Sequence, residues 1–148
     1  MYLKKDRILT ALAIMLDVAF YAGRSGVVSG NDIAKRNGLM RRGIEPILQA
    51  LSRAQLLDSV RGPKGGYRLA RSARIITLKE IACVVGTQED HMVSADNQLI
   101  QQVLAPYWRE LDASIEEKLS EYTLGDFLLR AEKAGLARPS QAPLSFSI

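Results

Sequence analysis

The sequence predicts a mainly α-helical fold with one small β-hairpin. Apolar residues recur at spacings of three and four in several stretches, which is the period of amphipathic helices. The stretch 59–71 reads SVRGPKGGYRLAR, and its glycines and proline separate two short segments, which predicts a hairpin. The 148 residues, 47% of them hydrophobic, suffice for one domain, or for one small domain with an appended helical element.

The first helix is predicted over residues 6–21, with Gly23 as its C-terminal cap. Its apolar stripe consists of Ile8, Leu12, Met15 and Ala19. The basic residues before this run resemble the start of a secretory signal, but Asp17 lies inside the run and the stripe favours a helix of the folded domain. No other apolar stretch is long enough to span a membrane.

Two further helices are predicted next. Ser29 or Asn31 caps a short helix over 32–36, and Gly38 ends it. A following helix, ending near residue 55, carries the apolar residues Ile44, Ile47, Leu48 and Leu51. Two helices joined by a tight glycine-containing turn form a helix-turn-helix.

The start of the third helix leaves two solutions open, because Pro46 lacks an N–H. If Gly43 is the N-cap, Pro46 takes the third helical position, where its N–H would have no partner, and Arg41 and Arg42 lie just before the helix. The alternative is a longer, kinked helix.

The hairpin is predicted from strands at 57–61 and 67–70. In the second strand, Tyr67 and Leu69 alternate with Arg68, so the first two face the domain and Arg68 faces outward. A helix, a helix-turn-helix and a basic hairpin, in that order, are the pattern of a winged helix, with the hairpin as its wing.

Later segments predict three more helices. Thr77 and Glu80 form a capping box for a helix that contains Cys83, the single cysteine. Pro106 begins a long helix of about 14 to 16 residues, roughly 22 Å. Thr123 caps a last helix that runs to about Ala134.

The long helix carries a narrow apolar stripe that we expect to form a dimer interface, consisting of Val103, Tyr107, Leu111, Ile115 and Leu119. We expect a winged-helix domain at 1–86, a sensor-type loop at 87–97, dimerisation helices at 98–135 and a flexible tail at 136–148.

Charge is divided unevenly along the chain. Residues 1–74 contain 14 Lys and Arg against 5 Asp and Glu, a net charge of +9, whereas residues 75–148 contain 6 against 11, a net charge of −5. The first half therefore favours a polyanionic partner such as nucleic acid.

From Tyr2 to about Gly86, and more loosely through Arg130, the sequence resembles the Rrf2 (Rrf-two) family of winged-helix transcriptional regulators. The resembling segments are DIAKRNGL, IEPILQALSRAQLLDSVRGPKGGYRLAR, ITLKEIACVVG and YWRELDASIEEKLSEYTLGDFL. The resemblance implies a cytoplasmic homodimer that binds palindromic operator DNA, and we expect a repressor. The sequence departs from the family at Gly43, where a bulky aromatic residue is common.

We expect the DNA contacts to come from the start of the first helix, the helix-turn-helix and the wing. The candidates are Lys4, Lys5, Arg7, Lys35, Arg36, Met40, Arg41, Arg42, Arg61, Lys64, Arg68 and Arg71. For Arg41 and Arg42, reading of a guanine and contact with a phosphate both remain open.

Relatives that bind an iron–sulfur cluster hold three cysteines where residues 87–97 of this chain read TQEDHMVSADN. An iron–sulfur cluster needs about four ligands, mostly thiolates, so we expect no cofactor. Whether Cys83 or His91 has a sensing role stays open.

Two other classes of function agree less well with the sequence. An enzyme is not expected, because the chain has one histidine and no G-x-S-x-G, P-loop or dinucleotide-binding motif. A winged helix that binds only proteins is the alternative, but it would need an apolar wing, and this wing is cationic.

Overall fold

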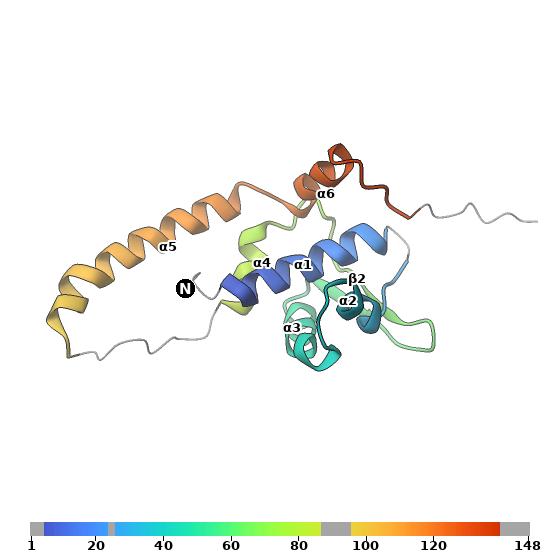
Figure 1. Ribbon diagram of the computed structural model, residues 1–148, viewed down its shortest axis with the longest axis horizontal. Coiled ribbons are helices and arrows are strands. Elements are labelled where there is room, and N and C mark those ends of the chain that lie inside the picture. Colours follow the sequence, from blue (N-terminus) through green and yellow to red (C-terminus); the bar gives the residue numbers. More distant parts are fainter. Residues whose placement is uncertain (1–4, 24–25, 87–95, 140–148) are drawn as a thin grey trace, which may run out of the picture.

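The computed structural model describes residues 5–23, 26–86 and 96–139. Its elements are α1 (Lys5–Tyr21), α2 (Gly30–Arg36), α3 (Arg41–Arg53), β1 (Leu57–Val60), β2 (Gly66–Leu69), α4 (Leu78–Val85), the π-helical segment η1 (Ile100–Leu104), α5 (Ala105–Ser120) and α6 (Leu124–Lys133). Figure 1 shows α1 in the middle of the body, with α3 and α6 on opposite sides of it and α5 extending away. The predicted fold class, mainly α with one hairpin, is confirmed.

Helix α1 is the centre of the hydrophobic core. Its residues Ala11, Ile14, Met15 and Val18 have no exposed surface. Of the predicted stripe, Leu12 is only partly buried, because the buried face of α1 is wider and lies slightly to one side of it. The helix packs against α2, α4, α6 and β2, so it supports both the helix-turn-helix and the hairpin.

The side chain of Arg36 joins helix α2 to α1. Arg36 donates hydrogen bonds to both carboxylate oxygens of Asp17, each at 2.8 Å, and its guanidinium lies 4.0 Å from the centre of the Tyr21 ring. The side chain of Asp17 is 7% exposed and that of Arg36 30%. The hydrogen bond with Asp17 raises the pKa of Arg36. Arg36, expected to contact DNA, is thus engaged inside the fold.

Of the two solutions that the sequence leaves open for the third helix, the longer helix is present and the Gly43 N-cap is not. Helix α3 begins at Arg41, with Met40 as an extended N-cap, so Arg41 and Arg42 are its first two residues and Pro46 lies inside it. Pro46 costs the helix one hydrogen bond. The buried face formed by Ile44, Ile47, Leu48 and Leu51 keeps the segment helical across this position.

The hairpin pairs Leu57 with Leu69 and Val60 with Gly66. A third, unpredicted segment pairs with it: the Val28 N–H donates to the Tyr67 carbonyl at 2.9 Å, and the Tyr67 N–H donates to the Val28 carbonyl at 2.7 Å. Tyr67 and Leu69 pack against the core, as predicted, while Arg68 is exposed.

Helix α4 begins with the predicted capping box. The Glu80 N–H donates to Thr77 Oγ1 at 3.2 Å, and the Thr77 N–H donates to Glu80 Oε2 at 3.0 Å. Arg71 donates to Glu80 Oε1 at 3.0 Å. Burial alone would raise the pKa of Glu80, but the hydrogen bonds from Thr77 and Arg71 outweigh it and lower this pKa. Arg71, expected at the wing, is therefore held at the hairpin base.

The long helix begins earlier than Pro106. The π-helical turns of η1 precede α5 without a break, and the wide turn directly before Pro106 removes the clash that this ring would make with an α-helical turn. No described residue of η1 or α5 is buried. Of the predicted stripe, Val103 and Tyr107 are 66% and 57% exposed, whereas Leu119 packs against the core.

Helix α6 begins with a capping box in which Thr123 and Asp126 exchange hydrogen bonds. It ends at Lys133, and Gly135, which follows the C-cap Ala134, has a φ of +82°. Several predicted features lie outside the described residues: Lys4, the side chain of Lys5, residues 87–95 of the expected sensor loop, which include His91, and residues 140–148 of the expected tail. Among the described helices, none is both long enough and apolar enough to cross a membrane.

We predict that Asp17→Asn lowers the free energy of unfolding by about 1–3 kcal/mol, because it leaves the Arg36 guanidinium without its carboxylate partner. Urea unfolding followed by circular dichroism measures this change. Glu132→Gln, which likewise replaces a carboxylate by its amide but at an exposed position of α6, is the control and should change the stability by less than about 0.5 kcal/mol. Equal effects of the two substitutions would contradict the role of the Arg36–Asp17 pair.

Candidate nucleic-acid interface

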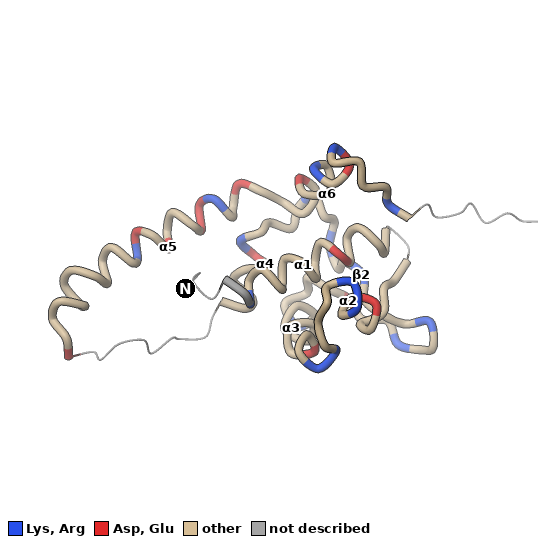
Figure 2. The backbone as a smooth tube through the Cα atoms, in the orientation of Figure 1, with Lys and Arg blue, Asp and Glu red and all other residues tan. Residues whose placement is uncertain are grey.

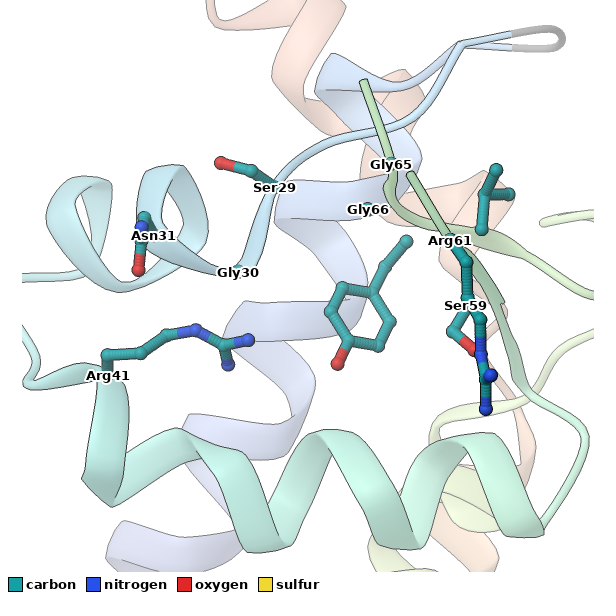
Figure 3. A pocket seen from close by; sticks show the side chains of 10 residues that line it. Ser29, Gly30, Asn31, Arg41, Ser59, Arg61, Gly65 and Gly66 are labelled. Carbon is teal, nitrogen blue, oxygen red and sulfur yellow. The ribbon is translucent and has the colours of Figure 1, made fainter. Parts of the chain in front are cut away.

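A groove of about 350 Å³ lies where the starts of α2 and α3 meet the hairpin. It is lined by Ser29, Gly30, Asn31, Arg41, Ser59, Val60, Arg61, Gly65, Gly66 and Tyr67. Figure 3 shows that its walls come from three segments that are distant in the sequence. Of the sequence-predicted residues, Arg41 and Arg61 are brought together in this groove.

Glycines allow the hairpin to approach the helix-turn-helix. A Cβ on Gly66 would lie 2.6 Å from the carbonyl carbon of Val28 and 3.0 Å from the N atom of Ser29, which no side chain can do without a shift of the backbone. At the hairpin tip, Gly62 has a φ of +117°, and its carbonyl accepts a hydrogen bond from the Gly65 N–H at 2.9 Å. The tip is therefore a tight turn that requires glycine.

Arg41 reaches the groove across Gly30. A Cβ on Gly30 would lie 2.6 Å from Nη2 and 2.7 Å from Nε of Arg41, so the guanidinium packs directly on the glycine backbone. Glu45, one turn further along α3, forms an ion pair with Arg41. In Figure 3 the Arg41 side chain points from α3 toward Gly30 and the interior of the groove. A planar guanidinium in this position suits phosphate or a guanine edge.

The hairpin tip presents cations to solvent. Arg61 and Lys64 are exposed, and neither forms an ion pair with another described residue. Arg68 lies opposite Asp58 in the strand register, and Arg68 Nε is 3.8 Å from Asp58 Oδ2. Both side chains are half exposed, so water screens this pair and Arg68 remains available to a stronger anion.

The exposed cations of the helix-turn-helix lie on the same side of the molecule as the hairpin tip. Figure 2 shows the basic segments of α2, the start of α3 and the hairpin tip along its lower side, whereas acidic and basic residues are mixed along α5. We call the basic face the set Lys35, Arg41, Arg42, Arg61, Lys64 and Arg68. Met40, 78% exposed, precedes α3 beside it.

Three predicted contacts lie elsewhere. Arg36 and Arg71 form the ion pairs with Asp17 and Glu80 described above. Arg7, near the start of α1, is half-buried, and its Nε is buried without a hydrogen-bond partner among the described residues. The structure therefore brings only part of the predicted set together.

Sequence reasoning missed the uncharged polar residues of the groove, which include Ser29, Asn31 and Ser59. The sequence identifies Ser29 only as a helix cap, and its Oγ does accept the Asp32 N–H at 3.1 Å. Short polar side chains and backbone N–H groups often contact phosphates beside arginines. The signal that could have found them is the short polar start of α2, which reads SGND over residues 29–32, opposite a glycine-rich hairpin.

Comparison with known proteins agrees with this geometry. The family model described as Rrf2, iron-dependent transcriptional regulator, matches residues 5–130. The chain is 34% identical over 132 residues to a putative HTH-type transcriptional regulator of Azotobacter vinelandii, ORF2, covering 86% of this chain and 80% of the relative. It is 34% identical over 122 residues to the HTH-type transcriptional regulator IscR of Vibrio vulnificus, covering 80% of this chain and 72% of the relative.

Solved structures show the same similarity. T. potens IscR superimposes with a TM-score of 0.71 and 34% identity, covering 90% of each chain. CymR, the global cysteine regulator of B. subtilis, superimposes with a TM-score of 0.63 and 30% identity, covering 82% of this chain and 92% of that one.

The family description names iron, but the residues of this chain do not fit an iron–sulfur cluster. Such a cluster takes about four ligands, mostly cysteine thiolates, and this chain has one cysteine and one histidine. Cys83 is half-buried on α4. Within the part of the chain that the structure describes, no three His, Cys, Asp or Glu residues are grouped so that they could hold a metal ion.

We predict that Gly66→Ala destabilises the protein by about 1–3 kcal/mol, because the new methyl group must push the hairpin away from Val28. Gly43→Ala is the control: no atom lies within 4 Å of the place that its methyl group would take on α3, and it should stabilise by up to about 1 kcal/mol. Chemical unfolding measures both values, and amide hydrogen exchange at Tyr67 should accelerate only in Gly66→Ala. A stable Gly66→Ala protein with a protected Tyr67 amide would contradict this packing.

Proposed function

The chain belongs to the Rrf2 family and is a DNA-binding transcriptional regulator, and we propose that it acts as a homodimer that represses transcription from a palindromic operator. The observation that carries the DNA-binding mode is the groove that Arg41 of the helix-turn-helix and Arg61 of the hairpin both line. We also propose that the protein is located in the cytoplasm, where the DNA lies.

In the proposed complex, the start of α3 enters the major groove. Arg41 and Arg42 are the first residues of this helix, the position from which a recognition helix contacts base edges. Since Arg41 is held by Glu45 and packed on Gly30, its reach is restricted, whereas Arg42 is exposed. Arg42 is therefore the better candidate for a base contact, and Arg41 for a phosphate beside the groove.

The hairpin contacts the DNA backbone in this proposal. Arg61 and Lys64 are exposed on a tight turn that carries no carboxylate, so phosphates can approach both cations and the backbone N–H groups of the tip. We assign no DNA contact to Arg36 and Arg71, because each joins two elements of the domain, Arg36 through Asp17 and Arg71 through Glu80.

The exposed helix formed by η1 and α5 supports the homodimer. Leu99, Val103 and Tyr107 are 74%, 66% and 57% exposed. An apolar row of this size on a helix that projects from the body is the feature of an interface that a second chain covers. The two basic faces would then address two half-sites about one helical turn of DNA apart.

Binding of a cluster is not part of the proposal, because the ligands are missing, and neither is catalysis. A winged helix that serves only protein contacts is not favoured, since the relatives are transcriptional regulators and the hairpin tip is cationic.

We predict that Lys64→Gln weakens operator binding by about tenfold at low salt and reduces the slope of log K against log salt by about 1.8, because a dimer loses two phosphate contacts. Fluorescence anisotropy with genomic DNA fragments across a salt series measures both quantities. Lys133→Gln, on the exposed end of α6, is the matched control and should bind as the wild type does. Wild-type affinity and slope in Lys64→Gln would exclude a wing contact to phosphate.

We predict that Tyr107→Glu dissociates the dimer, weakening self-association by about 30-fold or more, because a charge is placed in an apolar interface. Sedimentation equilibrium measures the association. Ala113→Glu introduces the same charge at an exposed position about 200° around α5 from Leu111 and should leave the dimer intact. Equal association of both variants, or a monomeric wild type, would contradict the proposed interface.

We predict that the protein purified without oxygen is colourless and contains no stoichiometric iron, because one cysteine per chain cannot supply the ligands of a cluster. Metal analysis and visible absorption provide the measurement. About one cluster per chain, with its visible absorption bands, would refute this prediction.

A further inference from the structure

A second, larger cavity of about 820 Å³ lies away from the basic face. It is formed by the C-terminal end of α1, by residues 69–74, which leave the hairpin, and by α6. In Figure 1, α6 and α3 lie on opposite sides of α1, so this groove does not belong to the surface assigned to DNA.

One wall of the groove is apolar. Ala19 of α1 and Leu128 of α6 are buried at its base, Leu69 is half-buried, and Leu129, 55% exposed, stands at its rim. The start of α6 is pinned to residues 73–76, because the Gly125 N–H donates to the Ala73 carbonyl at 2.9 Å and the Leu124 N–H to the Ile76 carbonyl at 3.0 Å. This wall is therefore preformed.

The charged residues of the groove are predominantly cationic: Arg71, Arg74 and Arg138 stand against one carboxylate, Asp126. Asp126 already accepts the Thr123 N–H at 2.9 Å as a helix cap, and Arg71 is paired with Glu80. Arg74 and Arg138 are exposed, and neither forms an ion pair with another described residue.

The position of Arg138 follows from the end of α6. Gly135 takes a φ of +82°, and the Leu136 N–H donates to the Ala131 carbonyl at 3.0 Å. This pair of features is a Schellman-type helix end, which turns the chain back along the helix. The turn brings Arg138 to the same groove as Arg74, although 64 positions separate them in the sequence.

We propose that this groove binds a small amphipathic anion, with a carboxylate or phosphate group between Arg74 and Arg138 and an apolar part against Leu128 and Leu69. Two guanidinium groups without carboxylate partners among the described residues provide charge-assisted hydrogen bonds to such a headgroup. A volume of about 820 Å³ is in the range of small-molecule sites.

The groove adjoins the wing directly. Leu69 is the last residue of β2, and the Ala70 N–H donates to the Leu56 carbonyl at 3.1 Å at the base of the hairpin. A ligand in the groove therefore contacts the strand that carries Arg68. That the bound anion regulates DNA binding rests on the proposed function, whereas binding of the anion to the groove does not.

The test uses the full-length protein without DNA, so that a failure of operator binding cannot affect it. Isothermal titration calorimetry with octyl phosphate should detect binding, and octanamide, an uncharged amphiphile that also has eight carbons, should bind about tenfold more weakly or not at all. The double variant Arg74→Gln/Arg138→Gln should lose about tenfold in affinity for octyl phosphate. Arg109→Gln, exposed on α5, is the control and should bind as the wild type does.

Absence of octyl phosphate binding would overturn the proposal, as would equal affinity for octanamide or undiminished affinity in the double variant. Both substituted arginines are exposed, so the variants should unfold at the wild-type temperature, and a thermal scan checks this. A second readout is the amide spectrum of the protein, in which Gly125 and Leu69 should shift with octyl phosphate in the wild type and not in the double variant.

Discussion

The candidate interface depends on one pair of backbone hydrogen bonds, those between Val28 and Tyr67. They join the segment before α2 to the second strand of the hairpin, and they form because Gly66 lets the two backbones meet. The hairpin also packs against the core through Leu57 and Leu69, but these two hydrogen bonds are the backbone pairing that joins it to the segment before α2. The groove between Arg41 and Arg61 exists because the contact fixes one element against the other. A two-stranded hairpin is marginal in isolation, so a third paired segment also stabilises it.

Internal ion pairs decide which arginines can act. Arg36 forms an ion pair with Asp17, and Arg71 with Glu80, and each pair joins two elements of the domain. By contrast, Arg42 and Arg61 are exposed to solvent. The net charge of +9 over residues 1–74 already cancels Arg36 against Asp17, but it counts Arg71 without its partner Glu80, which lies outside that range. The Arg36–Asp17 pair lies at the α1–α2 contact and the Arg71–Glu80 pair at the hairpin base, whereas Glu45 and Asp58 pair with Arg41 and Arg68 of the basic face itself.

Local signals predicted most of the fold. The Thr77–Glu80 capping box, the hairpin turn and the glycine ends of α1 and α2 depend on residues close in sequence, and all are present. The sequence left two starts of α3 open, and the longer helix forms because a buried apolar face outweighs the cost of Pro46. The Val28 pairing and the Arg36–Asp17 and Arg71–Glu80 pairs were missed because their partners are brought together only by the tertiary fold. For the candidate site, the sequence therefore predicted the basic residues that could contact DNA, but not which of them form ion pairs within the chain.

The central claim is that the start of α3 and the hairpin tip contact one DNA duplex together. Backbone amide chemical shifts of the protein, recorded while operator DNA is added, test it most directly. We expect Arg42 and Lys64 to shift at the same DNA concentration, while Glu132 at the far side of α6 does not. Shifts confined to α6, or a response of α3 without the hairpin, would contradict the claim.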